Sequence, residues 1–125
     1  MQALILAENP DVVFTHWPID THKDHQVASL LTVQSWARMG KDFALYFFEV
    51  CTGSQTTGFT PTDYVDITLT QGQKRKAVFC HTSQNPKAIY EADDCNHALI
   101  EKFRGVEMNV AAAEAFVKMN GTLSM

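Results

Sequence analysis

Residues 10–25 read PDVVFTHWPIDTHKDH, and this stretch decides how the chain folds. A short β-branched and aromatic run follows the proline and predicts a buried strand over Val12–Thr15. A polar loop comes next, and from Asp24 the apolar residues recur with helical spacing until Gly40. A buried strand that leads through a polar loop into a helix is the building unit of α/β proteins.

The downstream sequence repeats this alternation of strand and helix patterns. Strands are expected over Phe43–Val50 and Tyr64–Ile67. Thr68 and Gln71 match a capping box, so a helix is expected to run from there to about Ser83. The segment from residue 111 to residue 119 is either a helix or a short terminal strand.

Two helices define the expected packing. The first long helix carries a broad apolar stripe made of Val27, Ala28, Leu30, Leu31, Val33, Trp36 and Ala37. A later helix is expected from about Asp94 to Arg104, with Gly105 ending it. One face of this later helix holds Ala98, Leu99 and Phe103. Together these patterns predict an α/β fold with a Rossmann-like, largely parallel sheet flanked by helices.

Composition excludes several classes of protein. The chain has 125 residues, enough for one domain or a piece of a larger one, and 46% of them are hydrophobic. A net charge of -4 argues against nucleic-acid binding, and the longest apolar run, Phe43–Phe48, is too short for a transmembrane segment. The N-terminus lacks the basic region of a signal peptide. An odd count of cysteines, Cys51, Cys80 and Cys95, predicts free thiols and a cytoplasmic location.

The residues that could carry chemistry cluster in the loop after the first strand. Three of the five histidines fall within residues 16–25, together with Asp20 and Asp24. His22 and His25 are three residues apart at the start of a helix, which puts both imidazoles on one side. They could bind a metal such as zinc, or one could act as acid or oxyanion donor. Alternatively, Asp24 complements the helix dipole and His22 simply bonds the backbone.

The stretch from Pro10 to His25 resembles the second signature of the PIG-L/LmbE-like deacetylases, which are zinc-dependent N-acetyl hydrolases. The family pattern is P-D-V-[IV]-x-T-H…D-x-H-x-D-H. Further matches follow in the family's order: Phe48-Glu49-Val50, Gly53-Ser54-Gln55-Thr56, Tyr64-Val65-Asp66-Ile67, His81-Thr82-Ser83-Gln84, Arg104-Gly105 and Ala113-Glu114-Ala115-Phe116. The resemblance spans nearly the whole chain and implies hydrolysis of the N-acetyl amide of an amino sugar or its conjugate.

The resemblance also implies a role for each site residue. His25 matches the family's zinc-binding histidine, and His22 matches the histidine that polarises the substrate carbonyl or acts as acid. Asp24 matches the acidic residue that tunes the histidine's charge state. Asp20, Trp17 and His81 are expected to contact a small-molecule substrate; for Trp17, core burial is the alternative. The resemblance leaves the substrate and any oligomerisation unspecified.

One family signature has no counterpart. The pattern A-H-P-D-D, which supplies the other zinc ligands and the general base, is absent; the acidic pair Asp93-Asp94 lacks a preceding His-Pro and is expected to cap a helix. Residues 1–125 are therefore expected to form a single partial domain, the C-terminal part of the family's domain, apparently truncated at its N-terminus. A non-catalytic α/β remnant without a functional metal site is the alternative.

Overall fold

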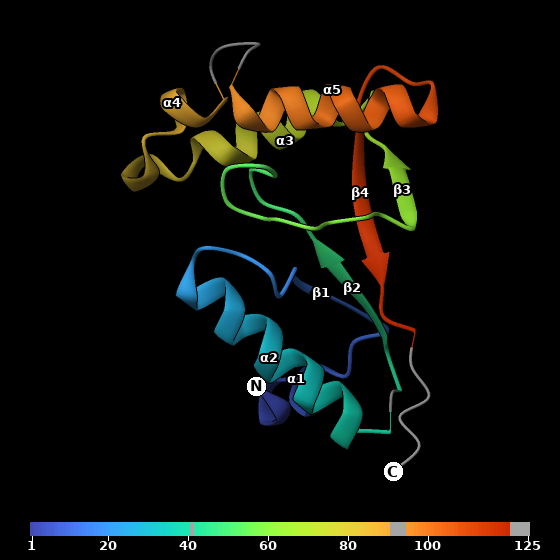
Figure 1. Cartoon of the computed structure of the whole chain (residues 1–125). Helices are drawn as coiled ribbons and strands as arrows, with labels where there is room; N and C mark the ends of the chain where they lie inside the picture. Colours follow the sequence, from blue (N-terminus) through green and yellow to red (C-terminus); the bar gives the residue numbers. More distant parts are fainter. Residues whose placement is uncertain (41, 91–94, 121–125) are drawn as a thin grey trace. The chain divides into compact units, whose positions relative to one another are not determined.

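A computed structural model describes residues 1–40, 42–90 and 95–120 (Figure 1). Four strands form one sheet in the order β1-β2-β4-β3. The strands are β1 (Val12–His16), β2 (Ala44–Phe48), β3 (Asp63–Asp66) and β4 (Ala113–Lys118). The chain divides into two compact units, Met1–Asp63 with Phe116–Met125 and, separately, Tyr64–Ala115. The mixture of strands and helices confirms the predicted α/β class.

In the first unit, β1 and β2 run parallel, with His16 opposite Phe48 at the end of the ladder. Strand β4 is antiparallel to β2, pairing Phe116 with Phe48. The sheet is therefore mixed where a largely parallel one was expected. The strand alternative for residues 111–119 is confirmed, because β4 occupies Ala113–Lys118.

Helices α1 (Gln2–Glu8) and α2 (Lys23–Arg38) lie side by side in this unit (Figure 1). The core between helices and sheet consists of Ile5, Trp36, Phe43, Leu45 and Phe47. Leu45 and Phe47 are two residues apart on β2, so both face the same side of the sheet. The indole N–H of Trp36 donates to the backbone carbonyl of Phe43 at 2.9 Å, which satisfies the one polar group that this tryptophan buries.

The helix α2 does not bury the stripe that its apolar residues suggest. Its buried side chains are Ser29, Thr32, Ser35 and Trp36, whereas Val27, Leu30 and Leu31 are exposed. The hydroxyls of Thr32 and Ser35 donate to helix carbonyls four residues earlier, at 2.7 and 2.8 Å, so these small residues are buried at low cost. The stripe prediction is wrong for the three exposed residues, because only contact with the sheet selects which face is buried.

The second unit contains the helices α3 (Gln71–Phe79), α4 (Pro86–Tyr90) and α5 (Asn96–Met108) and a 3-10 turn over Thr82–Gln84. The predicted capping box is wrong: Thr70 is the N-cap of α3 and makes no side-chain cap bond. The hydroxyl of Thr68 instead accepts from the Ala112 N–H at 3.4 Å. The predicted helix also ends earlier than Ser83, at Phe79.

Helix α5 runs past the glycine that was expected to end it. Gly105 lies inside the helix, and Asn109, with a φ of 58°, forms the left-handed C-cap. The expected start at Asp94, and the pair Asp93-Asp94, lie outside the described residues. Of the predicted apolar face only Ala98 is buried, since Leu99 and Phe103 are exposed.

A buried polar cluster replaces that apolar face. Glu101 is 3% exposed and accepts hydrogen bonds from Gln71 at 2.9 Å and from the Tyr90 hydroxyl. The Lys74 ammonium lies 2.6 Å from Glu101 and 2.5 Å from Glu114. Burial alone would raise the pKa of Glu101, but the hydrogen bonds from Lys74, Tyr90 and Gln71 outweigh it and lower that pKa. The cluster joins α3 and α5 through charge rather than apolar packing.

Candidate active site

The predicted site residues of the first unit lie where two parallel strands end. The loop after β1 carries residues 17–22, and the loop after β2 carries residues 49–57. Because β1 and β2 are parallel, both loops leave the same edge of the sheet, where α/β proteins bind ligands. The loops are joined by backbone hydrogen bonds from Thr57 to Ile19 at 3.1 Å and from Thr21 to Gln55 at 3.2 Å.

Asp20 is the buried centre of this arrangement, since its side chain is only 1% exposed. One carboxylate oxygen, Oδ1, accepts from the His22 backbone N–H at 2.7 Å and lies 3.3 Å from His25 Nδ1. The other oxygen, Oδ2, accepts from the Thr56 hydroxyl at 3.0 Å. Burial by itself raises the pKa of Asp20, but these hydrogen bonds outweigh it and keep the pKa below its ordinary value. Asp20 is therefore an ionised acceptor that the protein surrounds with donors.

His25 lies in the first turn of α2 with its ring between two other imidazoles. The His16 ring stacks on it with centroids 3.7 Å apart and planes within 7°, and the His22 ring lies 4.6 Å away. The amide nitrogen of Gln55 is 3.1 Å from His25 Nδ1. The Asp20 carboxylate can only accept, whereas the Gln55 amide can present either its nitrogen or its oxygen by turning over. Asp20 therefore decides the tautomer: Nδ1 carries the proton and the lone pair resides on Nε2. A metal ion would bind His25 at Nε2, through this lone pair.

In His22 the donor and acceptor nitrogens of the ring are exchanged relative to His25. It is the N-cap of α2, and its Nδ1 accepts from the Asp24 backbone N–H at 3.3 Å. In the neutral ring an accepting Nδ1 leaves the proton on Nε2, so His22 presents a donor. Its side chain is 54% exposed, and Asp24, 4.0 Å from the same nitrogen, is 91% exposed. The two histidines that the sequence singled out are thus suited to different tasks.

His16 completes the histidine cluster, although the sequence analysis gave it no role. Burial lowers the pKa of His16, and the neighbouring His25 and His22 rings lower it further, against the attraction of Asp20. Its Nδ1 is buried and has no hydrogen-bond partner in the part of the chain that the structure describes. A neutral imidazole with an unpartnered nitrogen is compatible with a polar group or metal ion arriving from outside.

The other two predicted substrate contacts are Trp17, in the first unit, and His81, in the second. Trp17 packs edge-on against Phe47 and Phe59 and donates its indole N–H to the Thr57 carbonyl at 3.1 Å. Its ring therefore belongs to the margin of the core. His81 is an exposed residue of the second unit, at the start of the 3-10 turn.

Gln55 and Thr56 are polar contacts of the cluster that sequence reasoning did not single out. Both lie in the loop after β2, and Thr56 is fully buried. The signal that could have found them is topological: the loop after the next parallel strand leaves the same edge of the sheet as residues 17–25.

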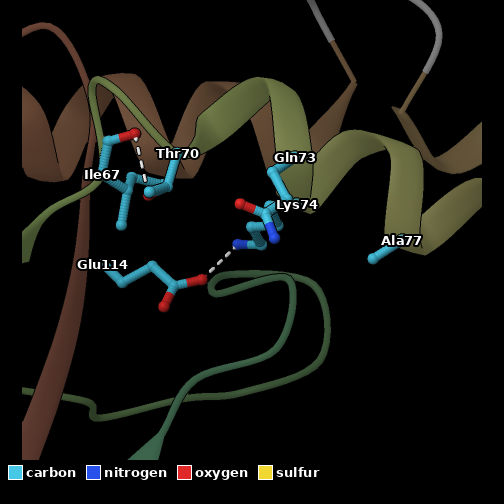
Figure 2. Close-up of a pocket in the computed structure, with 6 residues that line it drawn as sticks. All are labelled: Ile67, Thr70, Gln73, Lys74, Ala77 and Glu114. Atoms are coloured by element: carbon cyan, nitrogen blue, oxygen red, sulfur yellow. Dashed lines mark hydrogen bonds and ion pairs between the residues drawn. The ribbon is translucent and has the colours of Figure 1, made fainter.

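The second unit has an open hollow of about 320 Å³ lined by Ile67, Thr70, Gln73, Lys74, Ala77 and Glu114 (Figure 2). Lys74 points towards Glu114 across it. Burial opposes the charge of Lys74, but the bonds to Glu101 and Glu114 prevail and raise its pKa. Because two carboxylates already bind the Lys74 ammonium, Lys74 is not available to an anionic substrate, and the histidine cluster is the stronger candidate.

The histidine cluster fits part of a zinc centre. Among residues 1–40, 42–90 and 95–120, no three His, Cys, Asp or Glu side chains are placed to hold a metal ion together. His25 meets the requirements of one ligand, a free Nε2 and a carboxylate on Nδ1. Zinc sites need three or more protein ligands, so the described residues supply an incomplete set.

Solved structures of other proteins superpose on nearly all of this chain. A conserved protein from Thermus thermophilus superposes with a TM-score of 0.77 at 24% sequence identity, over 99% of this chain. An N,N'-diacetylchitobiose deacetylase from Pyrococcus horikoshii, solved with an inhibitor, superposes with a TM-score of 0.74 at 25% identity, over 94% of this chain. The fold is similar to that of a deacetylase. The chain spans 58% and 49% of the lengths of these two proteins.

Comparisons by sequence add no relative: no family model matches the chain, and no curated protein does. None of the helices in the described ranges combines the length and the apolar character that crossing a bilayer requires.

Proposed function

We propose that this chain carries the second catalytic motif of a zinc-dependent deacetylase of the PIG-L/LmbE-like family. The observation that carries the proposal is the contact of His25 with buried Asp20, beside His22 with its donor and acceptor nitrogens exchanged, at the edge where β1 and β2 end. The similarity to the Pyrococcus deacetylase supports the same interpretation. The reaction is hydrolysis of the N-acetyl amide of an amino sugar or its conjugate, in a cytoplasmic enzyme.

We assign His25, His22 and Asp24 different roles, according to the ring atom or charge that each presents. His25 would hold zinc through Nε2, and zinc, when bound, supplies a water of lowered pKa and polarises an amide carbonyl. His22 would donate a hydrogen bond from its Nε2–H to the substrate oxygen as negative charge develops there. In this role His22 keeps its proton and stays neutral, held in place by the Asp24 backbone N–H on Nδ1. In its protonated form the ring would gain the attraction of the nearby Asp24 carboxylate.

Two residues are proposed to contact the substrate. Trp17, at the margin of the core, is proposed to flank the sugar ring. His81, an exposed residue of the second unit, is proposed as a substrate contact on the family resemblance alone. Asp20, which was expected to touch the substrate, is engaged by protein donors, so we assign it to holding His25 in place.

Metal binding is the direct test. The 125-residue chain alone is expected to bind zinc weakly and to release no acetate from N-acetylglucosamine conjugates, because it lacks the remaining ligands and any match to the general base. Calorimetry should show that His25→Ala removes the weak site, whereas His22→Ala retains it. Unchanged zinc binding in His25→Ala would refute the ligand assignment.

Turnover needs the absent signature. In a longer chain with an A-H-P-D-D signature ahead of these residues, His25→Ala is expected to lose zinc. His22→Ala is expected to keep zinc and to lose at least about a hundredfold in turnover, the usual scale for an oxyanion or acid–base group. Wild-type turnover in His22→Ala would refute its role as donor. Tight stoichiometric zinc and turnover by the 125-residue chain alone would instead show that its ligand set is complete.

The incomplete ligand set also favours a second candidate, a non-catalytic α/β module that retains the fold without a working metal site. Metal analysis separates the two. A longer chain with the A-H-P-D-D signature that still bound no zinc would support the module.

A further inference from the structure

Thr56 connects the loop after β2 to the candidate metal ligand. Its side chain is fully buried, and its hydroxyl oxygen accepts from the Val50 backbone N–H at 2.9 Å. Because that lone pair is occupied, the hydroxyl proton is free to point at Asp20 Oδ2, 3.0 Å away. The orientation of this hydroxyl is therefore set by the backbone of its own loop.

The backbone holds Thr56 opposite Asp20. An isolated antiparallel bridge pairs the two residues, and hydrogen bonds from Thr57 to Ile19 and from Thr21 to Gln55 flank it. The backbone pairing of the two loops therefore fixes the contact between the Thr56 and Asp20 side chains.

The contact decides which way the Asp20 carboxylate faces. With Oδ2 bonded to Thr56, Oδ1 is left for the His22 backbone N–H at 2.7 Å and for His25 Nδ1 at 3.3 Å. A carboxylate in this position favours the ring tautomer whose proton is on Nδ1. Removing the hydroxyl would free Oδ2 and let the carboxylate rotate away from His25.

We propose that Thr56 is a positioning residue: through Asp20 it holds His25 in the tautomer that carries the proton on Nδ1 and the lone pair on Nε2. The consequence for metal binding rests on the proposed function, since a lone pair on Nε2 matters there only if His25 is a ligand. The tautomer itself is a property of the metal-free chain and can be measured without any catalytic assay.

The test uses the 125-residue chain labelled with ¹⁵N-histidine, at a pH where the imidazoles are neutral. Long-range ¹H–¹⁵N spectra should show a protonated Nδ1 and an unprotonated Nε2 for His25 in the wild type and in Thr56→Ser. In Thr56→Val the two nitrogens should shift towards each other, as a mixture of tautomers forms. An unchanged His25 spectrum in Thr56→Val would overturn the proposal.

A matched control distinguishes the positioning of Asp20 by Thr56 from the general effect of removing a buried hydroxyl. Thr32 is also buried, but its hydroxyl donates only within α2, to the Ala28 carbonyl. Thr32→Val should leave the His25 tautomer as in the wild type; a shift there equal to that of Thr56→Val would overturn the proposal. If Thr56→Val does not fold, Thr56→Ala removes the same hydroxyl and should also mix the tautomers, whereas a wild-type spectrum would overturn the proposal.

Metal affinity supplies the second readout. Cobalt titration should be weakened about tenfold or more by Thr56→Val and restored by Thr56→Ser, the scale known for residues that orient metal-binding histidines. If the wild type binds no cobalt even in a longer chain with the A-H-P-D-D signature, the proposed function fails, while the tautomer spectra still decide the role of Thr56. Wild-type cobalt affinity in Thr56→Val would overturn the link to metal binding.

Discussion

Gly105→Ala should destabilise this protein, although alanine is the better helix former. Gly105 lies inside α5, where replacing glycine by alanine ordinarily stabilises a helix by about 1 kcal/mol. Here a Cβ would lie 2.7 Å from the Val110 carbonyl oxygen and 3.0 Å from the Ala111 carbonyl carbon. These are backbone atoms, so they cannot move aside as the end of a flexible side chain can.

The cost exceeds the gain because the clash falls on the helix cap. The Gly105 carbonyl accepts from the Val110 N–H at 2.9 Å and from the Asn109 N–H. Overpacking costs about 1–3 kcal/mol. Each strained cap bond costs about 1 kcal/mol more. After subtracting the helix gain, the free energy of unfolding should fall by about 2–4 kcal/mol.

Gly72→Ala is the matched control, because Gly72 lies in α3 of the same unit and nothing is within 4 Å of its added Cβ. This variant should be more stable than the wild type by about 0.5–1 kcal/mol. Urea unfolding followed by circular dichroism measures both variants. Equal or greater stability of Gly105→Ala would refute the close approach of α5 to residues 110–111.

Three further outcomes follow from the packing. Glu101→Gln should lower stability at pH 7 by about 1–3 kcal/mol in urea unfolding, since Lys74 loses one of its two carboxylates; equal stability would refute a structural role for the cluster. The lowered pKa of Glu101 means that its stabilisation is present above its ordinary pKa of 4.5 and is lost as the pH falls through the lowered value. The difference between wild type and Glu101→Gln should therefore shrink between pH 7 and pH 3, and a constant difference would contradict this. Leu30→Gln should change the melting temperature little, because Leu30 is 57% exposed; a large fall in the melting temperature would contradict this and favour the buried stripe.

Local patterns were enough to predict the elements around the site. Runs of β-branched and aromatic residues placed β1 and β2, since these short segments must be buried on the sheet. The spacing of His22 and His25 placed both at the start of α2. The same local reasoning could not decide between helix and strand for Ala113–Lys118, because pairing with β2 determines that segment.

Tertiary contacts decided what each side chain does. The sequence shows Asp20 as one polar loop residue among several, and only the neighbouring loop, with Thr56, makes it the buried partner of His25. The helix faces followed the same rule: α2 buries serines and threonines against the sheet, and α5 buries Glu101 against Lys74. The periodicity of apolar residues predicts which residues share one face of a helix. Which face becomes buried is decided only by the element that packs against the helix.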